Sequence, residues 1–252
     1  PGICSRCVRQ FHDRRFPRIG DSVGATAATS IGEPITQMAL SQKHTAGASK
    51  GTARTYAGFD VINNIVQSPE SFPDRAAVAG RAGTVDAIED APQGGTHVTV
   101  SGERHYVPPG YPVLVKRGQK VEAGDQLSDG VIDPGDIVRL RGLGSGRRVY
   151  AERLKRALDD SGVPADARNV EIVARGAMDH VRVTDPEGTG DFLPDDVVGY
   201  ADVQRSYVPP ASATRVAARD AVGRYLQAPA LHYTIGTKLT RRMAERLEKA
   251  GF

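Results

Sequence analysis

Four side chains in the first fifth of the chain have the types and spacing of a ligand-contacting surface. They are an amide, an aliphatic chain, a hydroxyl and an imidazole: Gln37, Leu40, Ser41 and His44. In a helix, the spacing i, i+3, i+4 and i+7 places them in one stripe. Such a mixed stripe makes a poor core face, and it suits a ligand with a sugar edge, a flat apolar face and an anionic group. The alternative is an ordinary amphipathic helix that packs through Met38 and Leu40.

The two cysteines of the chain, Cys4 and Cys7, stand in a C-x-x-C pattern. Three interpretations stay open: half of a zinc site, a redox pair, or two unrelated thiols. A redox pair usually opens a helix within a thioredoxin-like unit, and nothing in the sequence resembles one. A structural zinc ion takes four ligands, and His12 could supply a third. We expect the missing ligands to lie upstream of Pro1.

The residues from Ser22 to Ala48 must position the polar stripe. Small and apolar residues predict a helix over 22–31, which Gly32 and Pro34 should end, because glycine lowers helix propensity and proline lacks an amide proton. Proline is tolerated as the first residue of a new helix. The region then predicts an antiparallel helical hairpin with a flexible tip, made of a helix over 36–45, a tip over 47–58 and a helix over 59–66.

The apolar pattern changes to a period of two residues after position 76. It predicts short strands, separated by Gly-Gly and Pro-Pro-Gly turns, at 85–88, 97–100, 105–107 and 113–116. The segment VKRGQKVEAGDQL (115–127) is similar to barrel-sandwich modules, in which two hairpins close a small barrel. Biotin and lipoate carrier domains share this appearance, but they need a modified lysine at a hairpin tip, and the sequence offers no such tip.

Beyond the β-rich part, the sequence predicts a mixture of helices and strands. A helix over 148–161 should bury Tyr150, Leu154 and Leu158 and expose a basic face. The further expectations are strands at 169–174 and 180–184 and amphipathic helices at 212–226 and 237–250. The fold class is therefore α+β. Its expected ranges are 1–21 for the C-x-x-C and a basic loop, 22–72 for the helical hairpin, 73–135 for a barrel-sandwich-like β module, 136–210 for an α+β segment and 211–252 for the C-terminal helices.

The string SIGEP-x-TQM-x-L-x-x-x-H-x-AG, which contains the polar stripe, carries a family resemblance. It resembles the trigger-helix signature of beta-prime, the largest subunit of multisubunit DNA-directed RNA polymerases. GICSRC resembles the last C-x-x-C of a cysteine cluster that precedes this region in the family. DIV-x-x-x-G, NVEIVAR and V-x-V-x-D-P resemble, in order, pieces of the beta-prime C-terminal region. The resemblance covers roughly residues 1–203 and fades beyond Pro210.

The resemblance implies template-directed nucleotidyl transfer, in which a trigger loop closes on the incoming nucleoside triphosphate. Two magnesium ions would stabilise the reacting phosphates, and their aspartates belong to another chain or an upstream segment, because the sequence has no D-x-D-x-D cluster. We therefore expect the chain to be inactive alone. The family pattern implies that Gln37 contacts the ribose, that Leu40 packs on the base, and that His44 lies beside the β-phosphate as a cation or a general acid.

Two positions depart from the family pattern. Ser41 stands where bacterial relatives place arginine and eukaryotic ones asparagine, so a direct charge on the triphosphate is lost. Lys43 stands where phenylalanine is usual, and it lies about 200° around the helix from Ser41, so it cannot replace the arginine. These departures predict a divergent polymerase, viral (phage-like) or plasmid-borne.

Composition adds weak constraints on partners. The net charge of +3 and the isoelectric point near 9.0 favour polyanions slightly. No run of 18 apolar residues and no signal sequence occur, so we expect no membrane partner and a location in the cytoplasm of a bacterial or infected host cell. The expected partners are the beta, N-terminal beta-prime and alpha-like subunits, template DNA, transcript RNA and nucleoside triphosphates. The alternative function is a non-catalytic, zinc-containing nucleic-acid-binding module.

Overall fold

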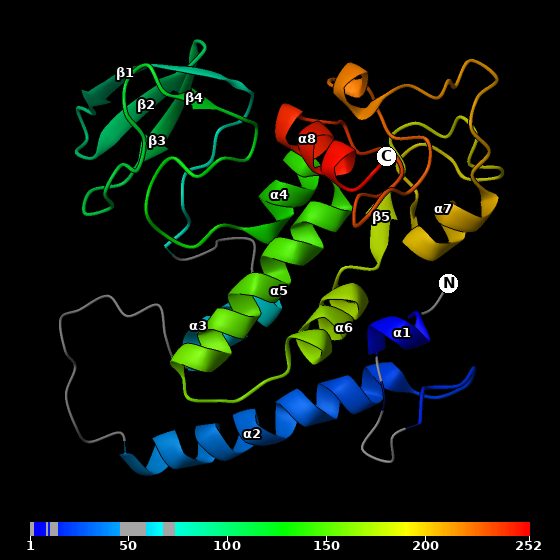
Figure 1. Ribbon diagram of the computed structural model, residues 1–252. Coiled ribbons are helices and arrows are strands. Elements are labelled where there is room, and N and C mark those ends of the chain that lie inside the picture. The colour runs from blue at the N-terminus through cyan, green and yellow to red at the C-terminus, as the bar shows by residue number, and fades with distance from the viewer. Residues whose placement is uncertain (1–2, 9, 11–14, 46–58, 68–73) are drawn as a thin grey trace. The chain divides into compact units, whose positions relative to one another are not determined.

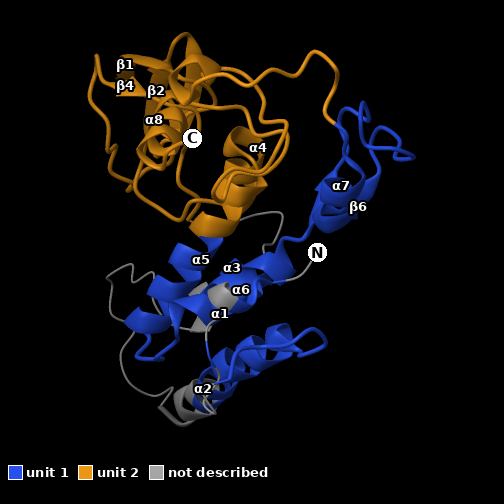
Figure 2. Ribbon diagram, turned by 45° about the vertical axis from the view of Figure 1, so that its right-hand side comes forward, with its two compact units in different colours: residues 1–69, 150–208 blue, residues 70–149, 209–252 orange. Residues whose placement is uncertain are grey.

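The computed structural model of the 252-residue chain describes residues 3–8, 10, 15–45, 59–67 and 74–252. The chain divides into two compact units, each assembled from segments that are far apart in the sequence (Figure 2). Unit 1 comprises residues 1–69 and 150–208, and unit 2 comprises residues 70–149 and 209–252. Helices and antiparallel strands both occur, which confirms the mixed α and β content. The five consecutive ranges expected from the sequence stay a prediction. No described helix has the length and apolar character needed to span a membrane.

Unit 1 is mainly helical. Its elements are α1 (Ser5–Val8), α2 (Val23–Thr45), α3 (Phe59–Gln67), the second half of α5 (Leu143–Asp160), α6 (Ala167–Ala177), β5 (His180–Arg182), β6 (Val197–Gly199) and α7 (Tyr200–Ser206). In Figure 1, α6 lies between α2 and α5. The strands β5 and β6 pair antiparallel, with Val181 opposite Val198.

The core of unit 1 lies where α2, α3, α5 and α6 meet. As expected, Tyr150, Leu154 and Leu158 of α5 are buried. They pack with residues of the three other helices: Ile31, Ile62, Ile65, Val170 and Ala174. Each fully buried large aliphatic side chain contributes about 1.5–3 kcal/mol to folding. The helices α2 and α3 thus share one core, but the residues between them lie outside the described part, so the hairpin with its tip stays a prediction.

The expected break at Gly32 and Pro34 is wrong, because α2 runs without interruption from Val23 to Thr45. An internal proline removes one backbone hydrogen bond and costs roughly 3 kcal/mol or more. The neighbours Ile31 and Ile35 pack against the unit 1 core on either side of the proline. Their burial offsets the cost, so tertiary packing overrides the local signal.

The strand expected at 169–174 is also wrong, because these residues belong to α6. The Asp166 side chain caps this helix by accepting a hydrogen bond from the Arg168 amide. Val170 and Ala174 are buried one helical turn apart, so the apolar pattern has a helical period as well as a period of two. The strand expected at 180–184 is confirmed over His180–Arg182.

Unit 2 contains a four-stranded antiparallel sheet in the order β3-β2-β1-β4. The strands are β1 (Gly83–Asp90), β2 (Thr96–Val100), β3 (Glu103–Val107) and β4 (Lys120–Val121). Val98 of β2 lies opposite Ile88 on one side and His105 on the other. A valine-rich core with Leu127 underlies the sheet. The first three expected strands are thus confirmed, and the barrel-sandwich closure stays a prediction.

The fourth expected strand, at 113–116, is wrong. Val113 makes only an isolated bridge with Ser128, and the Leu114 amide donates to the Leu127 carbonyl over 2.8 Å. Pro112 has no amide proton, so a regular ladder cannot extend backwards from Val113.

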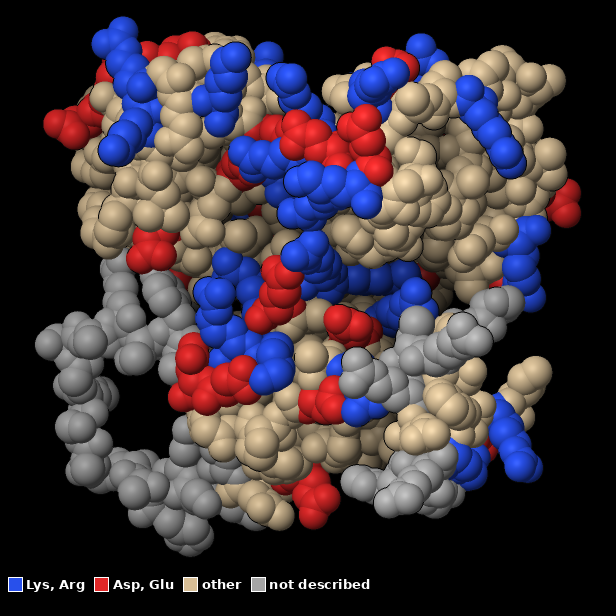
Figure 3. Space-filling model, in the orientation of Figure 1, with Lys and Arg blue, Asp and Glu red and all other residues tan. Residues whose placement is uncertain are grey.

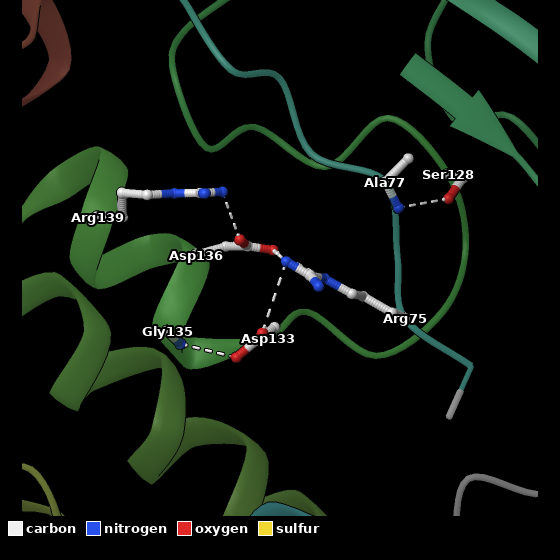
Figure 4. A network of polar contacts seen from close by, with 7 residues as sticks. All are labelled: Arg75, Ala77, Ser128, Asp133, Gly135, Asp136 and Arg139. Atoms are coloured by element: carbon white, nitrogen blue, oxygen red, sulfur yellow. Dashed lines mark hydrogen bonds and ion pairs between the residues drawn. The ribbon is translucent and has the colours of Figure 1, made fainter. Parts of the chain in front are cut away.

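An ion-pair network joins the segment before the sheet to α4 (Pro134–Arg141), as Figure 4 shows. The carboxylate of Asp136, whose side chain is 6% exposed, accepts from Arg75 over 2.5 Å and from Arg139 over 2.7 Å. Asp133 caps α4 by accepting from the Gly135 amide over 2.8 Å. One buried carboxylate therefore holds two arginines from separate segments.

The C-terminal part of unit 2 contains α8 (Arg241–Lys249), which Thr240 caps by accepting from the Met243 amide. This confirms the last expected helix in a shorter form. The helix expected at 212–226 is wrong, because only a 3₁₀ turn, η1 (Ala218–Ala221), forms there. The residues after this turn form a hairpin, in which the Leu226 amide donates to the Thr237 carbonyl.

Burial in unit 1 leads to a stability prediction. Leu154→Ala, at a side chain that is 1% exposed, should lower the free energy of unfolding by about 2–5 kcal/mol, because it removes apolar contacts and leaves a cavity. The matched control Leu193→Ala, at a side chain that is 65% exposed, should change it by less than about 0.5 kcal/mol. Urea unfolding of both variants provides the measurement, and equal losses would contradict the described core.

A second prediction concerns pH and His105 of β3. Burial lowers the pKa of the His105 imidazole, whose Nε2 is buried without a hydrogen bond and lies 3.9 Å from the Glu103 carboxylate. As the pH falls from 7.5 to 5.5, the His105 imidazole therefore binds a proton more readily in the unfolded chain than in the folded one. The free energy of unfolding should fall over the same range. His105→Gln should reduce this loss in urea unfolding at the two pH values, whereas Arg104→Gln on the same strand should not. A loss of stability that is the same in His105→Gln and the wild type would refute the assignment.

Candidate functional site on α2

All four residues of the predicted stripe lie on α2. The helix advances 100° per residue, so Gln37, Leu40, Ser41 and His44 fall within an arc of about 100° on one face. The Gln37 side chain is exposed. For Leu40, Ser41 and His44 the structure describes the backbone, and their side chains lie outside the description. The stripe is therefore confirmed as a helical face, and its contacts stay a prediction.

The face that α2 buries is a different one. Ala27 and Ile31 are buried, and Ile35 packs partly buried against the same core. Helical geometry places this face about 130° away from the polar stripe. The helical positions put Met38 on the same side as this face and Leu40 on the stripe, and both side chains lie outside the description. The arrangement leaves the stripe turned away from the packed face of its own unit.

A hydrogen-bonded pair that the sequence analysis missed ties α2 to α6. The Asn169 Nδ2 donates to the Ser30 Oγ over 2.7 Å, and the Ser30 hydroxyl donates to the Ala27 carbonyl over 2.8 Å. The pair was missed because Asn169 was assigned to a strand. Pro164 and Asp166 together form a helix-start signal that would have indicated α6.

The beginning of α2 is held at a second place. Val8 of α1 and Ala27 of α2 are buried against Ile172 of α6. The Arg168 guanidinium donates to the Val8 carbonyl over 2.9 Å and pairs with Asp166 over 2.5 Å. The first half of α2 thus packs on α6 and α1 through both apolar and polar contacts.

The basic loop before α2 is partly neutralised. The Asp21 carboxylate accepts from the Arg18 amide over 2.9 Å and from the Arg15 guanidinium over 2.6 Å. Both hydrogen bonds lower the pKa of the Asp21 carboxyl, and the one from the Arg18 amide has the larger effect. Arg15 therefore forms an ion pair with a carboxylate of its own loop.

The cysteine pair lies around the short helix α1. Cys4 immediately precedes it and is exposed, and Cys7 lies within it. A zinc ion would find two of its four ligands here. Within the described ranges, no three His, Cys, Asp or Glu side chains gather as a metal site. The half zinc site and the magnesium ions held elsewhere both stay predictions.

Comparisons with known proteins cover most of the chain. Residues 9–85, which contain α2 and α3, match the family described as RNA polymerase Rpb1, domain 5. The beta' subunits of DNA-directed RNA polymerase from Symbiobacterium thermophilum and Clostridioides difficile are 32% and 33% identical over 213 and 211 residues. Each match covers 80% of this chain but 17% of the relative. The chain thus spans a small part of the length of these relatives.

The Ser30–Asn169 pair generates a test of how α2 is held. Ser30→Ala and Asn169→Ala should each lower the free energy of unfolding by about 0.5–1.5 kcal/mol. The double variant should lower it by less than the sum of the two, because both substitutions remove the same hydrogen bond. Hydrogen exchange at the amides of the first half of α2 should accelerate in both. Thr26→Ala, which removes a hydroxyl bonded within α2 itself, is the control. Strict additivity in the double variant would show that the pair does not couple the helices.

Proposed function

Because the chain belongs to the beta-prime family of RNA polymerase subunits and corresponds to their C-terminal region, we propose that it forms part of a DNA-directed RNA polymerase. Within that enzyme, α2 is the element that closes on the incoming nucleoside triphosphate during RNA synthesis. The chain is inactive alone, because the residues for the metal-dependent step belong to an upstream segment or to another chain.

One observation carries this proposal: α2 presents its polar stripe on a face other than the one it buries. The first half of α2 is held by Ala27, Ile31 and the Ser30–Asn169 pair. Pro34 follows these contacts and weakens the backbone hydrogen bonding of the helix at that point. The part of α2 after Ile35 is therefore suited to move while the first half stays fixed.

The stripe offers one side chain for each part of a nucleotide. The Gln37 amide hydrogen-bonds the ribose hydroxyls, and the Leu40 side chain packs on the face of the base. The His44 imidazole donates to an oxygen of the β-phosphate, either as a cation or as the acid that protonates the leaving pyrophosphate. Proton donation of this kind typically contributes about 10²–10⁴ in rate. When bound, magnesium ions held elsewhere supply charge stabilisation at the reacting phosphates.

Closure of the stripe also excludes water. A helix that covers a matched nucleotide couples recognition to chemistry, because only a correctly seated substrate stabilises the closed form. Ser41 supplies a hydroxyl at the triphosphate but no charge. Lys43 lies about 200° from Ser41 around the helix and does not restore that charge. These two residues set this chain apart as a divergent member of the family.

Two further parts of the proposal concern metal and partners. Cys4 and Cys7 provide two thiolates of a structural zinc site whose other ligands lie upstream. The partners are beta, N-terminal beta-prime and alpha-like subunits, with template DNA, transcript RNA and nucleoside triphosphates. The family resemblance is what supports these parts of the proposal.

The test is single-nucleotide addition by the assembled polymerase that contains this chain. His44→Ala should slow the chemical step by about 10²–10⁴-fold if the imidazole donates a proton. Gln37→Ala should raise the apparent KM and reduce discrimination between ribose and deoxyribose substrates. Thr26→Ala, on the same side of α2 but about 16 Å along the helix before Gln37, should leave the rate unchanged. An unchanged rate in a His44→Ala, Gln37→Ala double variant would exclude the proposed closure.

The second candidate is a non-catalytic, zinc-containing nucleic-acid-binding module. The C-x-x-C pattern and the mild positive charge favour it. It requires that removal of zinc, or Cys4→Ser with Cys7→Ser, abolishes nucleic-acid binding by the chain. It also requires that His44→Ala affects no polymerase, which separates it from the first candidate.

A further inference from the structure

Positive charge is concentrated at the C-terminal end of the chain. Residues 209–252 contain eight lysines and arginines but three aspartates and glutamates, although the whole chain has a net charge of only +3. The rest of the chain is therefore slightly acidic. All eight cationic residues are exposed. The segment folds within unit 2, so its surface can be described on its own.

A hairpin displays an aromatic ring together with a cation. Tyr225 pairs with Lys238 across the hairpin, and the Lys238 Nζ lies 5.8 Å from the centre of the Tyr225 ring. The Tyr225 side chain is 59% exposed. Leu226, Tyr233 and Leu239 pack on the other side, with Met243 and Leu247 of α8. The core thus fixes the hairpin so that the ring faces solvent.

One flank of α8 carries only cations. Met243, Ala244 and Leu247 form its buried face. Arg242, Arg246 and Lys249, spaced i, i+4 and i+7, form one stripe, and the two glutamates of the helix lie on the opposite flank. In Figure 3, lysine and arginine side chains gather with carboxylates over α8. The stripe spans about 10 Å, at 1.5 Å per residue.

Most of these cations lack a carboxylate partner. Arg242 pairs with Asp125 over 2.8 Å, Arg241 lies 3.7 Å from Glu245, and Arg219 lies 3.9 Å from Asp220. In the part of the chain that the structure describes, five others make no ion pair: Arg215, Arg224, Lys238, Arg246 and Lys249. Five of the eight cations are thus unpaired within the described residues, and one of them, Lys238, lies beside the exposed Tyr225 ring.

We propose that the surface formed by Tyr225, Lys238, Arg246 and Lys249 binds single-stranded nucleic acid. Cations spaced along a helix can hold successive phosphates. The exposed Tyr225 ring offers a face on which an unpaired base can stack, and a duplex has no such base face to offer along its length. An acidic protein would match the charge but would leave the ring without a flat partner.

The proposal is independent of nucleotide closure by α2, because none of these residues lies in unit 1. The test uses the full chain and fluorescence anisotropy with a 20-nucleotide oligo-uridine, the same length of duplex DNA, and polyglutamate as a competitor. Oligo-uridine should bind most tightly, and its affinity should fall with salt. Stronger binding of the duplex, or equal competition by polyglutamate, would overturn the proposal.

Matched variants locate the surface. A triple variant, Lys238→Gln with Arg246→Gln and Lys249→Gln, should reduce the affinity for oligo-uridine at least tenfold. It should also reduce the salt slope, the slope of log affinity against log salt concentration, by about 2, because each lost phosphate contact removes about 0.7. Arg104→Gln, Lys116→Gln and Lys120→Gln combined, which remove three exposed cations of the β module, should leave both nearly unchanged. Equal losses in the two triple variants would overturn the proposal.

The ring has its own readout. Tyr225→Ala should weaken oligo-uridine binding about tenfold and leave the salt slope unchanged, whereas Tyr225→Phe should bind as the wild type. Circular dichroism and thermal unfolding report whether the variants fold. This binding assay does not depend on polymerase activity, so failure here and failure of the proposed polymerase role give different results. Unaltered binding by a folded Tyr225→Ala variant would exclude stacking.

Discussion

The packing of the first half of α2 against α6 is the interaction on which the rest of unit 1 depends. Ile31 belongs to the core that also holds α3 and α5, and Ala27 belongs to the smaller cluster with α1. Because these apolar contacts fix one face of α2, they also decide which face remains available. The chemistry proposed for the polar stripe follows from this choice of face.

The same packing explains how α2 continues through its internal proline. In isolation, Pro34 would end a helix, since its missing amide and its ring both oppose continuation. Here Ile31 and Ile35 hold the chain in helical geometry on both sides. The helix is firmly packed before the proline and lacks a backbone hydrogen bond at it. The second half of such a helix can move while the first half stays fixed. This division suits the closure on a nucleotide that we propose for α2.

Unit 2 uses a different device, in which a single carboxylate serves two arginines. Asp136 holds Arg75 and Arg139, and Asp125 accepts from Arg141 over 2.6 Å as well as from Arg242. Because Arg139 and Arg242 are more than half exposed, solvent screens their ion pairs, and separate segments are joined mainly through Arg75 and Arg141. Arg75 also lies 3.6 Å from Asp133, so two carboxylates share its charge.

Local patterns in the sequence were sufficient where one signal dominated. The alternating valines predicted β1, β2 and β3, the apolar stripe predicted the buried face of α5, and the amphipathic pattern at 237–250 predicted α8. They failed where two signals competed, as in α6, where valine-rich residues fit both periods, and at 212–226, where an amphipathic pattern became a hairpin with a 3₁₀ turn.

The sequence by itself determined the residue types of the polar stripe, their helical spacing and the family resemblance, because these depend only on the order of residues along the chain. Only the tertiary structure decided that α2 continues through Pro34, that Ser30 meets Asn169, and that distant segments combine into two units. The physical reason is that burial energy is a property of contacts between segments. Such contacts can outweigh a local helix-breaking signal of a few kcal/mol, and no local pattern encodes them.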